Sequence, residues 1–391
     1  ILGFEEATCP MSFELTAEHE ALRSVVREFA AQEIAPHVEE WDRAHHFPVE
    51  IVRRMGELGL IGAIFDEEYG GGGGDFTSLC VAIEEIGRVD QSMGITLEAA
   101  VGLGINPIAE FGSAEQKRQW LPDLVTGKNL AAFGLTEPGG GSDAQGATRT
   151  RADLDGGEWV INGSKAFITN SGTPITSVIT ITALTGPDEI SSILVPAGTP
   201  GLTVEPAYDK LGWHASDTHG LVFEDVRVPE SNLLGERGRG FHQFLATLDD
   251  GRIAIAALAV GLIQACLDLS SEYAVEREAF GRPIGSNQGI AFKLADLDVA
   301  LEAARLLTYR AAARKDSGRP IKQAAARAKL FATEAAVTAT RVLTQVMGGY
   351  GFIEAGPAAR LYRDAKILEI GEGTSEIQRL IIARGLGLPV R

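Results

Sequence analysis

Apolar residues recur with helical spacing near the start of the chain. Leu22, Val25, Val26 and Phe29 stand at the i, i+3, i+4 and i+7 positions of one helix face, and Thr16 precedes them as a candidate N-cap. This pattern predicts an amphipathic first helix.

Further helical segments follow up to about residue 130. Met55, Leu58 and Leu60 are placed in a second helix, which we expect to end at the glycine run 70–74. Two further helices are expected over residues 76–89 and 92–111. Pro36 and Pro122 are expected to end or bend the helical pattern. Together they predict an α-helical N-terminal domain over residues 12–130, and residues 1–11 receive no fold assignment.

Short runs of tryptophan, valine, isoleucine and threonine replace the helical pattern between about residues 131 and 238. The expected strands include Trp159–Ile161, Phe167–Thr169, Val178–Thr182, Ile193–Val195 and Leu221–Phe223. Turn signals between them are Asn162–Gly163, Gly186–Pro187 and Pro200–Gly201. We therefore predict a middle β domain, built as a sandwich or a barrel.

Long helices return over residues 239–391. Helices are expected around 245–272, along a stripe from Leu294 to Ala304 that ends near Gly318, over Ile321–Met347 and over Thr374–Ala383. Gly348–Gly349 closes the third of these in the manner of a C-cap. The pattern predicts a four-helix bundle, so the fold class is α+β with three domains.

Composition is that of an ordinary globular protein. The 391 residues include 45% hydrophobic and 23% charged ones, and the net charge of −18 argues against nucleic-acid binding. Acidic side chains predominate up to residue 300 and basic ones after it. This asymmetry is either a property of the solvated surface or a sign that the basic end meets an anionic ligand or another subunit.

Several classes of site and location are excluded by missing patterns. Cys9, Cys80 and Cys266 are far apart and form no CxxC pair, which fits a reducing cytoplasm, and no HExxH zinc motif occurs, so no metal is expected. The most apolar stretch, Ile253–Ile263, is shorter than the ~18–20 residues of a membrane span. The chain also lacks GxSxG, GxGxxG and Walker motifs, so any nucleotide cofactor is held in another way.

Two candidate ligand motifs fall at or within the β domain. Residues 135–143, Leu-Thr-Glu-Pro-Gly-Gly-Gly-Ser-Asp, combine glycines with hydroxyl groups, although a simple domain connection would also explain them. Phe167 and Thr169 are two residues apart on a strand and so share one face, as a flat ring ligand would require. Packing of Phe167 in the core is the alternative.

Three more motifs lie in the helical C-terminal part. Residues 277–284 pair Arg277 with Phe280, which suits a diphosphate and a stacked ring, and residues 345–351 are either a close-approach surface or a helix cap. In Gly371–Glu372–Gly373 a carboxylate stands on a tight turn, as a catalytic base must. Thr374 is expected to cap the following helix.

Taken in order, these five motifs and the run Lys210–Pro229 resemble the acyl-CoA dehydrogenase family, most closely its short-chain and broad bacterial members. The resemblance extends from about Phe13 to Leu386. It implies a helical domain, a middle β domain and a C-terminal four-helix bundle, in a homotetramer built as a dimer of dimers. That arrangement agrees with the three patterns described above.

The resemblance also implies FAD as the cofactor. Residues near the isoalloxazine would be Phe133, Leu135, Thr136, Ser142, Phe167 and Thr169. Those reaching the adenine-diphosphate end of FAD in a neighbouring subunit would be Arg277, Phe280, Gln288, Gln345, Gly348 and Gly349, with Thr374 and Glu376 completing the site. Phenylalanine at 167 replaces a tryptophan found in many members.

The implied reaction is α,β-dehydrogenation of an acyl-CoA to the trans-2-enoyl-CoA. Glu372 would remove the α-proton while flavin N5 takes the β-hydride. Some members carry the base within a Leu-Asp-x-x-Arg run, where this chain has Gly251, and this absence favours Glu372. Expected substrate contacts are Ser142, Leu245, Asp249, Arg252 and Gly373, with residues 94–104 bounding the acyl tail.

An electron-transferring flavoprotein is the expected electron acceptor. Two alternatives remain open, an oxidase-like flavoprotein that is reoxidised by O₂ and a non-catalytic binding protein with the same fold. His214 stands where many members have arginine. Acyl-chain length and pathway stay undetermined by the residues.

Overall fold

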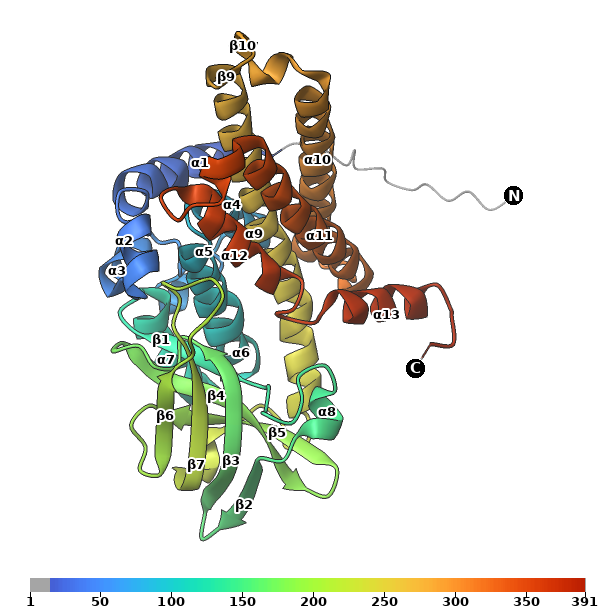
Figure 1. The fold of residues 1–391 in the computed structure, drawn as a ribbon. Coiled ribbons are helices and arrows are strands. Elements are labelled where there is room, and N and C mark those ends of the chain that lie inside the picture. Colours follow the sequence, from blue (N-terminus) through green and yellow to red (C-terminus); the bar gives the residue numbers. More distant parts are fainter. Residues whose placement is uncertain (1–14, 391) are drawn as a thin grey trace.

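The computed structural model describes residues 15–390 (Figure 1). Cys9 and the unassigned extension over residues 1–11 lie outside this range. A helical N-terminal domain, a central sheet and a C-terminal helical bundle follow one another along the chain, so the expected order of domains is confirmed. Figure 1 shows the sheet at one end of the long helix α9.

The N-terminal domain consists of helices that wrap one apolar core. Its α-helices are α1 (Ala17–Phe29), α2 (Val38–Ala44), α3 (Val49–Glu57), α4 (Phe76–Val89), α5 (Gln91–Glu98), α6 (Asn106–Phe111) and α7 (Ala114–Val125). The shorter turns are the π-helical η1 (Ala30–Ile34) and η3 (Ala99–Ile105) and the 3-10 helix η2 (Glu67–Tyr69). The Thr16 side chain accepts from the His19 N–H at 3.3 Å, which confirms the predicted N-cap.

Two expectations for this domain were wrong in detail. α3 ends at Glu57, so Leu58 and Leu60 lie in the turns that follow, where Leu60 is still buried in the core. Pro122 does not interrupt a helix but stands in the last turn of α7. Its missing N–H leaves only the Arg118 carbonyl without an intrahelical donor, and Arg118 is exposed enough for water to replace it.

The middle domain is one connected mixed sheet. Its strands are β1 (Leu130–Gly134), β2 (Arg151–Asp155), β3 (Glu158–Thr169), β4 (Thr176–Gly186), β5 (Glu189–Pro196), β6 (Leu202–Ala207), β7 (Thr218–Pro229) and β8 (Leu233–Leu234). They run in the order β6-β7-β3-β2-β4-β5-β8, with β1 parallel to β4, and short helices α8 (Ala144–Ala147) and η4 (Glu230–Asn232) connect them. Both halves of the sheet contribute to one apolar cluster that includes Trp159, Ile181 and Phe223, so the sheet encloses its own core.

The turn expected at Asn162–Gly163 is not formed. Both residues lie inside β3, where the pairing with β7 shifts register between Ile161 and Gly163. Gly163 has φ +149°, and a Cβ there would lie 2.6 Å from the Thr150 Cα. Glycine therefore marks a bulge with a close backbone approach, which the sequence pattern does not distinguish from a turn.

The C-terminal domain is a bundle whose fourth helix was not expected. α9 (Gly240–Glu276), α10 (Gln288–Asp316) and α11 (Lys322–Met347) are joined by α12 (Pro357–Leu368), which packs on α9 and α11. α13 (Ser375–Gly385) contacts α11 but extends away from the bundle in Figure 1. Pro357 at the first turn and the buried Ala358, Leu361, Ala365 and Leu368 are the signal that sequence analysis missed.

The connection between α9 and α10 is a small hairpin, made of β9 (Glu278–Ala279), β10 (Arg282–Pro283) and the 3-10 helix η5 (Ile284–Ser286). The 3-10 helix η6 (Gly348–Gly351) follows α11 directly. Both features lie at the same end of the bundle, because residues from the end of α9 and from the end of α11 line one groove.

Helix α9 forms the centre of the bundle. Its 37 residues make it long and apolar enough to cross a membrane, which corrects the expectation that no segment reaches that length. Most of its apolar stretch is buried inside the protein, as in a core helix. Cys266 on α9 and Cys80 on α4 are both buried free thiols.

Buried polar contacts fix the N-terminal domain against the bundle. The Glu84 carboxylate on α4 accepts from Tyr309 Oη at 2.6 Å and from Arg305 at 2.8 Å, both on α10. The Asp316 carboxylate accepts from the Phe76 N–H at 2.7 Å and so caps the start of α4. These contacts hold α4, and α5 directly after it, alongside α9.

Candidate active site

Glu372 lies on a strained turn between α12 and α13. Its φ is +52° and that of Gly373 is +93°, so a non-glycine residue occupies the left-handed region beside a glycine. Lys329 on α11 donates from Nζ to the carbonyl oxygens of both Gly371 and Gly373, and Gln378 Nε2 donates to Gly373 at 2.8 Å. These donors hold the turn in place from both sides.

The Glu372 carboxylate is buried. Among residues 15–390, no N–H or hydroxyl group donates to either of its oxygens. Burial raises the pKa of Glu372, and the neighbouring Lys329 and Arg252 limit that rise. A desolvated carboxylate of this kind is a stronger base than one in water.

Lys329 was not singled out from the sequence. Its side chain is buried, and burial lowers its pKa to about 8 although Glu372 opposes the shift. The pattern of α11 places residue 329 on the apolar face of the helix, so a lysine there was itself a signal for a buried partner.

Gly251 faces Glu372 directly. A Cβ at Gly251 would overlap a carboxylate oxygen and lie 2.9 Å from the Glu372 Cδ. A side chain at position 251, where some members of the resembled family carry the base, would therefore enter the space that the Glu372 carboxylate occupies. Asp250 points elsewhere, because its carboxylate accepts from Lys315 Nζ at 2.8 Å.

Three of the expected substrate residues share one face of α9. Leu245, Asp249 and Arg252 follow at i, i+4 and i+7 spacing, and Arg252 forms an ion pair with Asp249. Leu245 is exposed and Arg252 is buried. Gly373 lies in the Glu372 turn, whereas Ser142 lies in the exposed loop before α8.

The two motifs of the β domain lie side by side. The Ala166 N–H donates to the Thr136 carbonyl at 2.9 Å, which joins the 135–143 segment to β3. Phe167 is 64% exposed with φ +62° at an irregularity in β3, so the alternative of core packing is wrong. Thr169 follows two residues later on the same strand and is partly exposed.

A buried ion pair that sequence analysis missed supports this segment. Lys165 Nζ donates to Glu137 at 2.9 Å and to the Leu135 carbonyl at 3.2 Å, and Lys165 is 1% exposed. The Glu137 carboxylate also accepts from the Thr150 N–H at 3.0 Å. Burial lowers the pKa of Lys165 to about 8 against the opposing effect of Glu137.

Phe133 also belongs to the expected cofactor residues. Its ring is buried and stacks on Phe244 of α9 with ring centroids 3.7 Å apart. The contact fixes β1 against the start of α9. Leu135 and Thr136, two and three residues later, are partly exposed.

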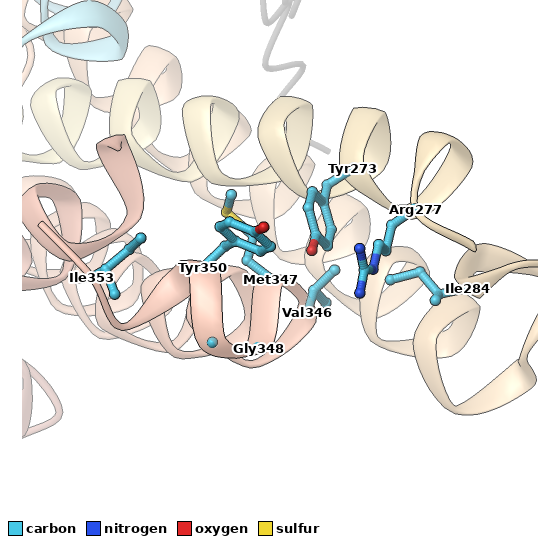
Figure 2. Close-up of a pocket in the computed structure, with 9 residues that line it drawn as sticks. Tyr273, Arg277, Ile284, Val346, Met347, Gly348, Tyr350 and Ile353 are labelled. Atoms are coloured by element: carbon cyan, nitrogen blue, oxygen red, sulfur yellow. The ribbon is translucent and has the colours of Figure 1, made fainter. Parts of the chain in front are cut away.

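A second set of expected cofactor residues meets in a groove at the far end of the bundle (Figure 2). In Figure 2, Tyr273 and Arg277 from α9 point toward Val346 and Tyr350 from the end of α11 and the turn after it. The groove encloses about 560 Å³, and a Cβ at Gly348 or Gly349 would meet no atom within 4 Å. Phe280 and Gln288 lie exposed on the adjoining hairpin and the start of α10, and Gln345 is exposed on α11.

Thr374 and Glu376 lie beside the Glu372 turn and not at this groove. Thr374 Oγ1 accepts from the Ile377 N–H at 3.3 Å, which confirms its predicted role as the N-cap of α13, and Glu376 is exposed in the first turn.

Gly251, which faces Glu372, is 26 residues from Arg277 on α9, or roughly 39 Å at about 1.5 Å per residue. The two sets of residues do not converge within one chain.

His214 is placed away from both sets. Its Nδ1 lies 3.1 Å from Asp42 Oδ1, and its ring stacks on His45 with centroids 4.1 Å apart. Arg363 on α12 pairs with the same aspartate at 2.7 Å. His214 therefore joins the loop after β6 to α2 and, through Asp42, to α12.

Comparison with known proteins agrees with this architecture. Models of the acyl-CoA dehydrogenase N-terminal, middle and C-terminal domains match residues 16–128, 132–226 and 238–387. The chain is 51% identical over 381 residues to the probable acyl-CoA dehydrogenase YngJ of Bacillus subtilis, covering 96% of this chain and 100% of that protein.

Two solved structures are similar throughout. Butyryl-CoA dehydrogenase from Megasphaera elsdenii matches with a TM-score of 0.93 and 42% identity over 96% of this chain and 100% of that one. A chain from the structure described as the electron transferring flavoprotein of Acidaminococcus fermentans matches with a TM-score of 0.94 and 43% identity. The match covers 96% of this chain and 99% of that one. The chain belongs to the acyl-CoA dehydrogenase family.

Proposed function

We propose that this protein catalyses the FAD-dependent α,β-dehydrogenation of a short-chain acyl-CoA and that Glu372 removes the α-proton. The observation that carries the proposal is the Glu372 turn. The Glu372 carboxylate is buried, accepts from no donor among residues 15–390, stands on a turn held by Lys329 and Gln378, and faces Gly251 of α9. Membership of the family and the similarity to a butyryl-CoA dehydrogenase support the reaction and the chain length.

Proton transfer follows from the state of the Glu372 carboxylate. The α-carbon of a thioester is a weak acid, so the base has to be desolvated and aimed before the substrate arrives. The enolate that develops needs donors fixed in advance. Among the described residues, the Glu372 N–H has no backbone acceptor, so it is available to the thioester oxygen while Lys329 and Gln378 occupy the flanking carbonyls.

The residues near β3 suit a flavin. The exposed Phe167 follows Ala166, whose N–H donates to the Thr136 carbonyl, and precedes Thr169 by two residues on β3. An exposed aromatic ring and two threonines in neighbouring segments suit a flat, polar-edged ring system. Phe167, Thr136, Thr169, Leu135 and Ser142 would hold the flavin end, and Phe133 would support it from behind. FAD, when bound, supplies the acceptor for the β-hydride.

The diphosphate end of FAD would be held by a second subunit. Arg277 with the open Gly348–Gly349 turn suits a diphosphate, since a guanidinium and two glycines without side chains in the way of a ligand line one groove. The ~39 Å that separates it along α9 from the Glu372 site is too long for one cofactor to contact both within a chain. We infer a homo-oligomer, a dimer of dimers, in which each FAD is shared, with Phe280, Gln288, Gln345, Thr374 and Glu376 completing the contacts.

The residues that contact the substrate and the identity of the electron acceptor are part of the same proposal. Leu245, Asp249, Arg252, Ser142 and Gly373 are proposed to contact the thioester arm. The electron acceptor is proposed to be an electron-transferring flavoprotein, supported by the similarity to a chain from such a structure. A cytoplasmic location remains a prediction.

Anaerobic mixing of the purified holoenzyme with a panel of acyl-CoAs tests the proposal. We expect the flavin absorbance to bleach fastest with short chains, and no bleaching with any thioester would overturn the dehydrogenase function. Glu372→Gln should retain FAD but lose several orders of magnitude in bleaching rate. Glu115→Gln, which changes an exposed carboxylate on α7, is the matched control and should bleach at the wild-type rate.

Reoxidation of the bleached enzyme distinguishes the acceptors. Rapid recovery of absorbance with an electron-transferring flavoprotein and slow recovery in air supports the dehydrogenase. Rapid recovery in air would instead indicate the oxidase-like alternative.

A further inference from the structure

A second buried carboxyl group lies against the proposed base. Glu98 is the last residue of α5, where the helix changes to the π-helical η3, and it is 0% exposed. Among residues 15–390, no N–H or hydroxyl group donates to either Glu98 oxygen. Leaving a buried carboxylate without any donor is strongly unfavourable, so this side chain requires a partner.

The partner within reach is Glu372. α5 packs on α9, and Gly251 of α9 faces the Glu372 carboxylate, whose oxygens are likewise buried without a donor among the described residues. The carboxyl groups of Glu98 and Glu372 are hydrogen-bond partners. The cations near Glu372 are otherwise engaged. Lys329 donates to the carbonyls of the turn, and Arg252 pairs with Asp249.

Two carboxylates in contact in a buried site cannot both ionise, and a hydrogen bond between them needs one proton. Resting on the proposed function, we propose that Glu98 is a positioning residue for Glu372, with the two carboxyl groups sharing one proton and protonated Glu98 donating the hydrogen bond that orients the Glu372 carboxylate.

The environment decides which group keeps the proton. Lys329 and Arg252 act on Glu372 and favour its ionised form, whereas none of the cations in the described part of the chain acts on Glu98. Burial raises the pKa of both groups, and the like charge of Glu372 raises that of Glu98 further. Glu98 therefore stays a neutral acid. During the reaction the α-proton passes to the free oxygen of Glu372, and the Glu98 proton is not consumed.

Two substitutions of similar size separate the donor from the side-chain volume. In Glu98→Gln the amide donates the same hydrogen bond, so the acid limb of the pH profile of flavin reduction should stay at its wild-type position. In Glu98→Met the donor is lost, the pKa of Glu372 rises, and the acid limb should move to higher pH by about one unit. Below that limb, about tenfold fewer enzyme molecules then carry an ionised base.

An infrared measurement gives a readout that is independent of turnover. The spectrum of the wild-type holoenzyme minus that of Glu98→Gln at neutral pH should contain one carboxylic-acid C=O band, because the variant no longer holds the shared proton. Absence of this band, or superimposable pH profiles for wild type and both variants, would overturn the proposal. Equal shifts in both variants would also overturn it.

The experiments distinguish failure of the proposed dehydrogenase function from failure of the proposed role of Glu98. If no acyl-CoA bleaches the wild-type flavin, the dehydrogenase function is wrong, whatever the infrared band shows. If the wild type bleaches but Glu98→Met keeps the wild-type acid limb, only the role of Glu98 is wrong.

Discussion

Replacing Gly251 by alanine is expected to slow proton abstraction without removing any group that performs it. The added methyl group would overlap a Glu372 carboxylate oxygen and lie 2.9 Å from its Cδ and 3.4 Å from its other oxygen. Non-bonded carbon atoms separate to about 3.5–4.0 Å, so the carboxyl group has to move by roughly 1 Å. A displacement of that size at a catalytic group reduces the rate by about 100-fold, or ~2.7 kcal/mol in the barrier.

Rapid anaerobic mixing with a short-chain acyl-CoA measures the effect as the rate of flavin bleaching. FAD content and the thermal unfolding midpoint should remain near the wild-type values, since alanine is favoured over glycine in a helix interior by about 1 kcal/mol and offsets local strain. A lower rate with normal FAD content then reports the position of the base.

A double-mutant cycle with Glu372→Asp supplies the control. The shorter side chain withdraws the carboxyl group from the added methyl, so Gly251→Ala should have little further effect in the Glu372→Asp background. Bleaching at the wild-type rate in Gly251→Ala, or additive losses in the double variant, would refute the steric argument.

The domain order and the helix boundaries near caps were predictable because local signals decide them. Thr16 and Thr374 accept the expected cap hydrogen bonds, and the segment 76–89 is a helix as predicted. α12 was missed although Pro357 and the helical spacing of the apolar residues after it indicate a helix. The reason is that the segment is short and follows a glycine-rich turn. Gly163 was misread because a glycine at a bulge and one at a turn satisfy the same local pattern.

The candidate site was only partly predictable for a different reason. Glu372 stands on a recognisable Gly-Glu-Gly turn, but the groups that set its protonation come from elements far apart in the sequence. Lys329 and Glu98 look like isolated charges on apolar helix faces until packing brings them to the turn. The same holds for Lys165, whose partner Glu137 lies 28 residues away in sequence.

Three further changes have definite expected outcomes. Arg277→Ala should weaken FAD retention on dilution while leaving the fold intact, and unchanged cofactor content would remove the proposed diphosphate role of the groove. Lys165→Met leaves the Glu137 carboxylate buried without its cation and should lower the free energy of unfolding in urea by about 3–5 kcal/mol, whereas the exposed control Lys128→Met should change it by at most about 1 kcal/mol. Burial raises the pKa of Asp364 from 3.8 to about 7, so its protonation stabilises the folded state at low pH and that contribution is lost as the pH rises toward 7. Asp364→Asn, which still accepts from the Trp213 N–H, should therefore gain stability relative to wild type between about pH 5 and about pH 8, and parallel urea midpoints would contradict this.

Because the environment of Glu372 is assembled from separate domains, its basicity depends on how those domains pack. Glu98 is held on α5, which follows α4, and α4 is fixed by the Glu84 contacts with Tyr309 and Arg305 on α10. Lys329 and Arg252 belong to α11 and α9 of the bundle. A movement of α4 relative to α9 would separate Glu98 from Glu372 and change the pKa of the base, even though the residues of α4 do not take part in the proposed chemistry. In the proposed mechanism, the buried polar contacts between α4 and α10 therefore preserve the protonation of Glu98 and Glu372 as well as the fold.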